Sequence, residues 1–344
     1  MSTIVRLPGL TDVHVHLRTP GGEHKEDFIS GSAAALAGGF TRVLAMPNTR
    51  PPLVTLDEWQ AAQARADHEA LCTVHLLAGA APAHLTELPA LAAVALGLKL
   101  YMDETYGSLR MTALPDLVAC FALWPRRKPI AVHAEGASVA AAIGLAAATG
   151  HAVHICHVSR RAEIELIAAA KERGLPVTCE VTPHHLFLTD VDARRLGALA
   201  DMRPTLGTAD DQAALWAALD HTIDCVATDH APHTLVEKQG PNPPPGVPGL
   251  ETALPLLLDA VHDGRLSLDR LVTLLDVNPR RIYGLDSQTD TWVEVDLEAR
   301  YTLNDETLYT KCGWTPFAGR PVTGRVLRVC QNGRLVVDDG RILH

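Results

Sequence analysis

The feature that most constrains the fold is a regular alternation of short apolar runs with longer alanine-rich segments. The runs have the length of buried strands, and the segments between them have the length of helices. The predicted strands are residues 10–16, 40–46, 72–78, 97–102, 130–135, 152–157, 176–181 and 224–229. The predicted helices between them are residues 28–37, 56–68, 83–95, 112–123, 137–149 and 160–173, then a helical stretch ending at Leu219. This order predicts an α/β chain folded as a (β/α)₈ TIM-type barrel.

The end of the chain differs from this pattern. Residues 291–344 alternate polar and apolar positions, and Asn332-Gly333 is typical of a hairpin turn. We therefore predict a catalytic barrel over residues 1–290 and a small C-terminal β-rich appendage over residues 291–344. Because the first predicted strand begins so near Met1, we expect no N-terminal strand in the appendage. A doubly wound open sheet is the alternative fold, but no glycine-rich phosphate turn follows the first strand.

Composition limits the possible partners. The chain has 344 residues, 47% hydrophobic and 20% charged, so it can bury a large core. Its formal net charge of −10 argues against nucleic acid or an anionic membrane as a partner. Any anionic substrate therefore needs local positive charge.

Cysteine usage indicates a reducing compartment. The seven cysteines are odd in number and show no repeated spacing, which argues against a disulfide framework. Residues 1–9 lack a basic segment followed by an apolar core, and the longest apolar stretches are broken by proline or glycine. We therefore expect a cytoplasmic protein with no signal peptide and no membrane span.

A His-x-His pair ends the first predicted strand. His14 and His16 lie two residues apart, so their rings point to one face of a strand. Two neutral imidazoles there provide half of the ligands of a zinc ion, and Arg18 can hold an anion beside them. The pair alone also fits two ordinary polar histidines in the core or on the surface.

Further polar residues stand at the ends of other predicted strands, where TIM-type barrels carry their active sites. With the first pair they form the set His14, His16, Lys99, His133, His157, Glu180 and Asp229. So many ligand-type residues at one end of a barrel predict a metal centre.

Lys99 is the unusual member of this set, because an ammonium has no lone pair for a metal. A neutral lysine amine can react with carbon dioxide to give a carbamate, whose two oxygens can bridge two metals. The alternative is a lysine stem that packs inside the barrel with its charge paired. The residues alone leave both interpretations open.

Six motifs, taken together, resemble those of the cyclic amidohydrolases. They are residues 12–18 (DVHVHLR), 46–49 (MPNT), 97–101 (GLKLY), 132–135 (VHAE), 154–158 (HICHV) and 228–233 (TDHAPH). Their order and spacing are most similar to those of the dihydroorotase domain of the animal multifunctional pyrimidine-synthesis protein, over about Arg6 to Pro316. The resemblance implies a (β/α)₈ barrel with a binuclear metal centre.

The resemblance also implies which residues bind zinc. One zinc ion would be held by His14, His16, Lys99 and Asp229, and the other by Lys99, His133 and His157, with carbamylated Lys99 as the bridge. Asp229 would also act as the general acid and base. In animal-type enzymes the equivalents of His14, Cys156 and Glu180 form a third zinc position. Strand alternation, however, would turn Cys156 away from His157 unless the strand end is kinked, and a buried free cysteine is the alternative.

The implied reaction is the reversible cyclisation of N-carbamoyl-L-aspartate to L-dihydroorotate and water, a step of de novo pyrimidine biosynthesis. Both small molecules carry a carboxylate that Arg18 can clamp in two hydrogen bonds, and the resemblance adds Asn48 and His233 as further donors. Arg203 is a weaker candidate for substrate contact, with a surface arginine as the alternative.

Residues 101–110 resemble the mobile loop that covers the active site in this family. Thr105 would reach the substrate at the loop tip, and Tyr106 stands where the family usually has phenylalanine. Closure of such a loop excludes water from the reacting groups.

Two other functions remain open at this point. The first is a hydantoinase, dihydropyrimidinase or allantoinase, although an uncharged ring gives the buried guanidinium of Arg18 nothing to pair with. The second is a catalytically silent scaffold, for example for aspartate transcarbamoylase, although silent members should have lost ligands. The resemblance also suggests a homodimer and possible association with aspartate transcarbamoylase.

Overall fold

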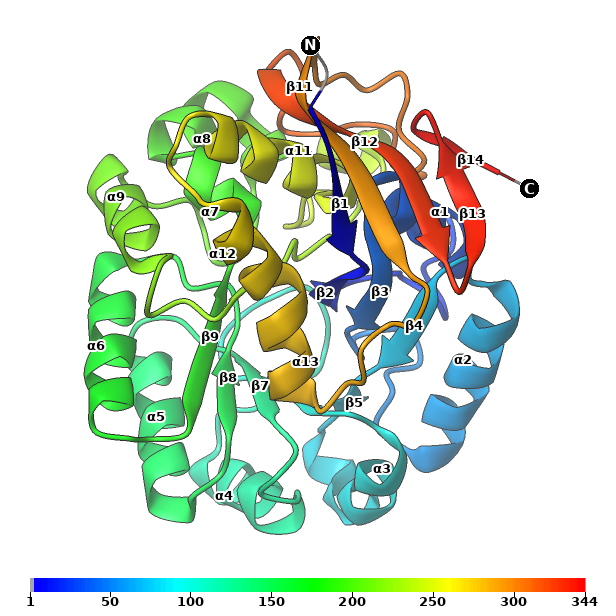
Figure 1. Ribbon diagram of the computed structural model, residues 1–344. Coiled ribbons are helices and arrows are strands. Elements are labelled where there is room, and N and C mark those ends of the chain that lie inside the picture. The colour runs from blue at the N-terminus through cyan, green and yellow to red at the C-terminus, as the bar shows by residue number, and fades with distance from the viewer. Residues whose placement is uncertain (1–2, 344) are drawn as a thin grey trace.

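A computed structural model describes residues 3–343 and has a closed parallel barrel at its centre (Figure 1). The barrel strands are β2 (Leu10–Val15), β3 (Phe40–Ala45), β4 (Thr73–Leu76) with β5 (Ala78–Gly79), β6 (Leu98–Tyr101), β7 (Ile130–His133), β8 (Val153–Ile155), β9 (Val177–Val181) and β10 (Cys225–Val226). One sheet has the order β2-β3-β4, and the other contains β5 to β10 in sequence order. The predicted strand at residues 72–78 corresponds to β4 together with the start of β5. A parallel bridge between Val15 and His230 closes the ring. The predicted (β/α)₈ TIM-type fold is therefore confirmed.

Helices surround the barrel (Figure 1). The long ones are α1 (Phe28–Ala37), α2 (Leu56–Glu69), α3 (Leu88–Val94), α4 (Leu114–Leu123), α5 (Ala137–Thr149), α6 (Arg161–Glu172), α9 (Ala209–Ala218) and α11 (Leu250–His262). Shorter ones are α7 (Pro183–Phe187), α8 (Asp190–Leu196), α10 (Leu235–Lys238), α12 (Leu268–Val272) and α13 (Asn278–Tyr283), with 3₁₀ turns at Pro82–Glu87 and Gly197–Ala200 and a π-turn at Thr273–Val277. The single helix predicted over residues 83–95 is wrong. The segment begins as the 3₁₀ turn Pro82–Glu87, which contains a non-helical His84 (φ −126°), and only α3 is α-helical. Pro89 lies in the first turn of α3, where a helix tolerates proline.

Local sequence explains where α1 begins. Asp27 has extended backbone and its carboxylate accepts a hydrogen bond from the amide of Ser30 at 2.8 Å, while the Ser30 hydroxyl accepts one from the Asp27 amide at 3.2 Å. This reciprocal cap satisfies two of the free amides at the helix start. The cap therefore fixes the end of the loop between β2 and α1. This loop carries Arg18.

An antiparallel sheet packs beside the barrel, at the upper right of Figure 1. Its order is β1 (Ile4–Pro8), β11 (Trp292–Thr302), β12 (Pro321–Gln331), β13 (Arg334–Asp338) and β14 (Arg341–Ile342). The expected hairpin turn is present, because Asn332 and Gly333 both have positive φ (51° and 78°).

The expectation that the N-terminus gives no strand to this sheet is wrong. Residues Ile4 to Pro8 pair with Asp296 to Trp292 in antiparallel register. The chain thus enters through the appendage sheet before it reaches the barrel, and the division at residue 290 stays a prediction. Within residues 3–343, no helix has the length and apolar character needed to cross a membrane.

Candidate active site

The predicted metal ligands meet at the carboxyl ends of the barrel strands. His14 Nε2 lies 3.3 Å and His16 Nε2 lies 3.0 Å from Oδ1 of Asp229. Nδ1 of His133 lies 2.9 Å from Nε2 of His157. Side chains from β2, β7 and the ends of β8 and β10 therefore converge on one buried point.

The donor atoms fit a metal ion. Those of His14, His157 and Asp229 all lie within 4.8 Å of one another, as do those of His14, Cys156 and Glu180. Among the described residues, Nδ1 of His157 has no hydrogen-bond partner, and Nε2 of His133 lies 3.4 Å from Oε1 of Glu135. The two nitrogens that face each other are Nδ1 of His133 and Nε2 of His157. Imidazole nitrogens that face each other at this distance are typical of ligands that share a metal.

Burial lowers the pKa of three of the candidate ligand histidines. It lowers the pKa of His16 to about 4, against the opposing effect of Asp229. It also lowers the pKa of His133, and it holds the pKa of His157 well below its usual value with help from the His133 ring. A neutral imidazole keeps the lone pair that a metal needs.

Asp229 supplies the negative charge of the centre. Burial alone would raise the pKa of its carboxyl, but the neighbouring His14 and His16 rings outweigh burial and hold the pKa well below its usual value. The backbone at Asp229 has φ +46°, a region that side chains other than glycine seldom adopt. This local geometry turns the carboxylate toward the two imidazoles.

Lys99 lies fully buried among these residues on β6. Its Nζ is 2.9 Å from Sγ of Cys156 and 3.5 Å from Nε2 of His14. No carboxylate of the described residues lies within 4.0 Å of Nζ to form an ion pair. A buried ammonium without a counter-charge is costly, so the interpretation of Lys99 as a lysine with a paired charge has no support in the structure.

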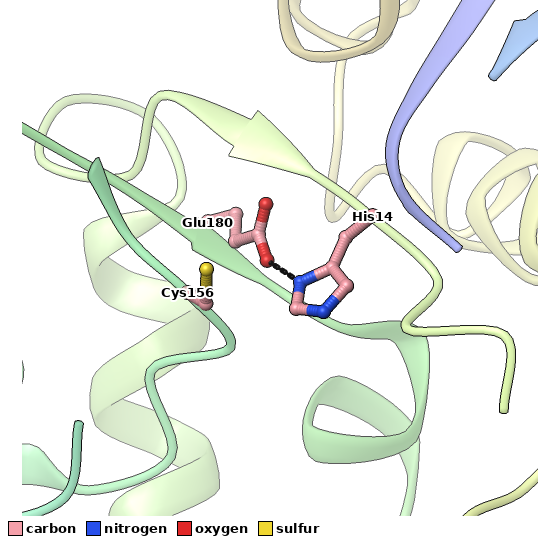
Figure 2. Close-up of side chains that lie close together, drawn as sticks. All are labelled: His14, Cys156 and Glu180. Atoms are coloured by element: carbon pink, nitrogen blue, oxygen red, sulfur yellow. Dashed lines mark hydrogen bonds and ion pairs between the residues drawn. The ribbon is translucent and has the colours of Figure 1, made fainter. Parts of the chain in front are cut away.

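Cys156 faces the same point as the histidines. Figure 2 shows the His14 ring and the Glu180 carboxylate pointing toward one another, with the Cys156 sulfur near both. The strand end is kinked, since the backbone at His157 has φ +34°, and this kink allows Cys156 and His157 both to point inward. Burial raises the pKa of the Cys156 thiol, with Lys99 opposing.

Glu180 orients His14. Its Oε1 lies 2.5 Å from Nδ1 of His14, and its Oε2 lies 3.0 Å from Nε2 of His154. Burial opposes ionisation, but these two rings hold the pKa of Glu180 well below its usual value. A carboxylate that accepts the Nδ1 proton leaves the other nitrogen of His14 free to bind a metal.

A pocket opens beside the metal ligands. Seven predicted residues line it, namely His16, Arg18, Asn48, Thr105, Tyr106, Arg203 and Asp229. Arg18 is 7% exposed and donates from Nε to the carbonyl of Pro232 at 3.0 Å. Its Nη2 lies 3.1 Å from Nε2 of His233, so His233 also reaches this region.

The loop over the pocket is held on its inner side. Asn48 donates from Nδ2 to the carbonyl of Tyr106 at 2.9 Å, and its Oδ1 lies 2.8 Å from Nδ1 of His16. Both amide atoms of Asn48 thus have partners, one of them in the loop. Arg203 donates to Asp201 at 2.5 Å and is half-buried at the pocket wall, which is compatible with either predicted role.

Two further residues contribute near the pocket, and the sequence pointed to only the first, since Asp12 lies on the same strand face as His14 and His16. Asp12 accepts hydrogen bonds from the amides of His14 at 3.0 Å and Thr228 at 3.2 Å, and burial raises its pKa to about 7. Lys25, which sequence reasoning missed, contacts His233 and Tyr106. Its position in the loop after the first barrel strand was the available signal, because such loops build the active sites of barrels.

Known proteins share this architecture. Residues 3–99 match the family described as dihydro-orotase-like. The chain is 50% identical over 99% of its length to the multifunctional protein CAD of Squalus acanthias, of which it spans only 15%. It is also 36% identical over 96% of its length to a dihydroorotase of Staphylococcus epidermidis, of which it covers 87%.

Two solved structures are similar throughout. One is the L-hydantoinase (dihydropyrimidinase) of Arthrobacter aurescens, with a TM-score of 0.91 at 26% identity, covering 98% of this chain and 86% of that one. The other is the inactive dihydroorotase-like domain of a CAD-like multifunctional protein from Chaetomium thermophilum, with a TM-score of 0.84 at 28% identity, covering 99% and 97%. Sequence and structure agree that the chain belongs to the dihydroorotase family.

Proposed function

We propose that this protein is a zinc-dependent dihydroorotase. It interconverts N-carbamoyl-L-aspartate and L-dihydroorotate, with loss or gain of water, in pyrimidine biosynthesis. One observation carries the proposal: the pocket that ends at His16 and Asp229 also contains the buried guanidinium of Arg18. Metal ligands alone indicate the chemistry of amide hydrolysis, whereas a buried guanidinium in the same pocket selects an acidic substrate.

The donor set supports two zinc ions. His14, His16, Lys99 and Asp229 would hold one, and carbamylated Lys99, His133 and His157 would hold the other. When bound, such ions polarise the substrate carbonyl and lower the pKa of water, so that a nucleophile is available near neutral pH. The buried Lys99 without a carboxylate partner favours the carbamate, since that group turns a buried cation into an anion among metal ligands.

A third zinc would rest on His14, Cys156 and Glu180. It needs Nδ1 of His14, the atom that lies 2.5 Å from Oε1 of Glu180. The competing role of Glu180 is to accept the Nδ1 proton and orient the ring. Zinc content therefore distinguishes the two roles.

The chain's own residues move the proton and hold the substrate. The pKa of Asp229 is held well below its usual value by the neighbouring His14 and His16 rings, and Asp229 lies at the junction of the ligand cluster and the pocket, as a group that shuttles a proton to the ring nitrogen must. Arg18, Asn48 and His233 bind the substrate carboxylate. Thr105 and Tyr106 cover it from the loop and exclude bulk water.

The two rival functions each have a structural neighbour. The similarity to a hydantoinase concerns the fold, and it does not account for a guanidinium that is 7% exposed beside the site. The similarity to an inactive domain concerns the fold, whereas every predicted ligand position is filled here. Fold alone does not decide between them; the residues of the site do.

One assay tests the proposal. Protein of measured zinc content is tested for cyclisation of N-carbamoyl-L-aspartate and for hydrolysis of L-dihydroorotate, dihydrouracil and hydantoin. We expect turnover of the acidic pair and little turnover of the uncharged rings. Faster turnover of hydantoin or dihydrouracil would favour the cyclic amidase, and no turnover of any substrate by zinc-loaded protein would favour the silent scaffold.

Assembly and location belong to the same proposal. A similar animal relative is a multifunctional protein of which this chain spans 15%, which supports association with other activities, and we propose aspartate transcarbamoylase as the partner. We propose a homodimer, the commonest closed assembly. All seven cysteines are buried and free within the described residues, in keeping with a cytoplasmic protein.

A further inference from the structure

Lys25 places a buried ammonium behind the pocket. Its side chain lies in the loop between β2 and α1 and is 5% exposed as a residue. Its Nζ lies 3.0 Å from Nδ1 of His233, 3.1 Å from the hydroxyl of Tyr106 and 3.0 Å from Oε1 of Glu237. An ammonium has three donors and no acceptor, so these three partners account for all of its hydrogen bonds.

This contact fixes the tautomer of His233. Because Lys25 can only donate, Nδ1 of His233 must accept, and a neutral ring then carries its proton on Nε2. The ring is neutral, since burial and the nearby Arg18 and Lys25 charges lower the pKa of His233 far below its usual value. Nε2 lies 3.0 Å from the carbonyl of Pro245, an acceptor that suits this proton.

The tautomer of His233 decides what Arg18 can bind. Nη2 of Arg18 is 3.1 Å from Nε2 of His233. With the proton on Nε2, both atoms are donors and neither satisfies the other. Nη2 of Arg18 can then turn to an anion, and a bound carboxylate competes with the carbonyl of Pro245 for the Nε2 proton. With the proton on Nδ1, the lone pair of Nε2 would accept the Arg18 hydrogen and would also repel a carboxylate. The ammonium of Lys25 excludes this second arrangement.

The same ammonium reaches the loop over the pocket. The Tyr106 ring meets the His233 ring edge-on with centroids 4.9 Å apart, and Cζ of Arg18 lies 5.2 Å from the Tyr106 centroid. The hydroxyl that contacts Lys25 is the atom by which Tyr106 differs from the phenylalanine usual in the family. One buried cation thus touches both the anion-binding histidine and the covering loop.

We propose that Lys25 is a positioning residue that sets His233 and Arg18 as a pair of hydrogen-bond donors for the substrate carboxylate and ties Tyr106 over them. The proposal rests on the proposed dihydroorotase function for the identity of the anion. The part that concerns the tautomer depends only on Lys25 and His233, and it is tested without turnover.

The first test observes the tautomer directly. Histidine-labelled protein gives ring ¹⁵N signals, and the spectrum of His233→Gln assigns those of His233. We expect Nε2–H in the wild type, and Nδ1–H or a mixture in Lys25→Met. Lys128→Met is the control, because Lys128 is partly buried and donates to two carbonyls, those of Ala92 and Ala95, without contacting His233 or the segment around Pro245. We expect Nε2–H to persist in that control.

The second test measures specificity. Dihydrouracil is the L-dihydroorotate ring without its carboxylate, so the ratio of their kcat/KM values isolates the anion. Lys25→Met should lower this ratio by roughly 10- to 100-fold, mainly through KM, as expected for hydrogen bonds to a charged group. Lys25→Arg should recover part of it, and Tyr106→Phe should leave the His233 tautomer unchanged.

The outcomes separate the two proposals. An Nε2–H tautomer in Lys25→Met would overturn the positioning role whatever the enzyme's activity. If that variant does not fold, Lys25→Leu, which also lacks a hydrogen-bond donor, supplies the same measurement. A changed tautomer with an unchanged specificity ratio would also overturn it, whereas absence of dihydroorotase turnover in the wild type would count against the proposed function and leave the tautomer result standing.

Discussion

The metal-facing side of the pocket and its anion-facing side are built in opposite ways. The proposed metal side gathers nitrogen and oxygen lone pairs from imidazoles and carboxylates that stand on or directly after barrel strands, such as His14, His133 and Asp229. The anion side gathers hydrogen-bond donors from loops, with Lys25 and Arg18 after β2 and His233 after β10. A rigid strand end suits a metal that needs fixed geometry, and loops suit a substrate that must enter and leave.

The largest effect should come from removing the residue that joins the two proposed metals. Lys99→Ala should lose most bound zinc and bring activity to the background rate, since both ions share this ligand. Zinc content by atomic absorption and turnover of L-dihydroorotate check it. Lys171→Ala, which removes a half-exposed lysine paired with Asp224, is the control. Two tightly bound zinc ions and normal turnover in Lys99→Ala would disprove the carbamate.

Asp229→Asn should have the next largest effect. It removes a ligand and the proton shuttle, and loss of an acid–base group typically lowers kcat by about 10²- to 10⁴-fold. Kinetics and zinc content are measured together, because a variant that keeps two zinc ions but has low kcat isolates the proton step. Wild-type kcat at full zinc content would remove Asp229 from the mechanism.

Arg18→Gln tests the anion side alone. The substitution leaves the proposed metal ligands in place, so zinc content should not change. The ratio of kcat/KM for L-dihydroorotate to kcat/KM for dihydrouracil should fall by roughly 10- to 100-fold. Arg50→Gln is the matched control, because Arg50 is exposed and stands at the mouth of the adjoining hollow. Equal effects of the two substitutions would indicate general electrostatic attraction rather than a clamp.

The same contrast explains what the sequence predicts well. Buried parallel strands have a continuous apolar pattern, so their positions could be predicted from the sequence. Their ends were less exact, because the predictions run two or three residues past the regular strands at β7, β8 and β10. His14, Lys99, His133 and Glu180 were found in this way. The pairing of β1 with β11 joins residues nearly 290 positions apart, and nothing in the local pattern of Ile4–Pro8 specifies such a partner.

The anion side was harder to predict. The contact of Lys25 with His233 depends on how two loops fold toward each other, and strand periodicity carries no information about it. Backbone turns also escape periodicity: Arg18, His157 and Asp229 have positive φ of 60°, 34° and 46°. Simple alternation therefore gives the wrong direction for Cys156, because the kink at His157 lies just beyond the regular strand.

Cys156→Ser should give the smallest effect and decides between the two roles of Glu180. If the wild type binds a third zinc, Cys156→Ser should lower the zinc content from three to two ions per chain. Activity should fall only a few-fold, because Glu180 still orients His14. Cys225→Ser is the matched control, since Cys225 is another buried cysteine of the same inner cluster. A content of two zinc ions in both wild type and variant would leave Glu180 as the acceptor of the His14 proton. The metal side would then hold two ions, with Cys156 as a neutral thiol packed against Lys99.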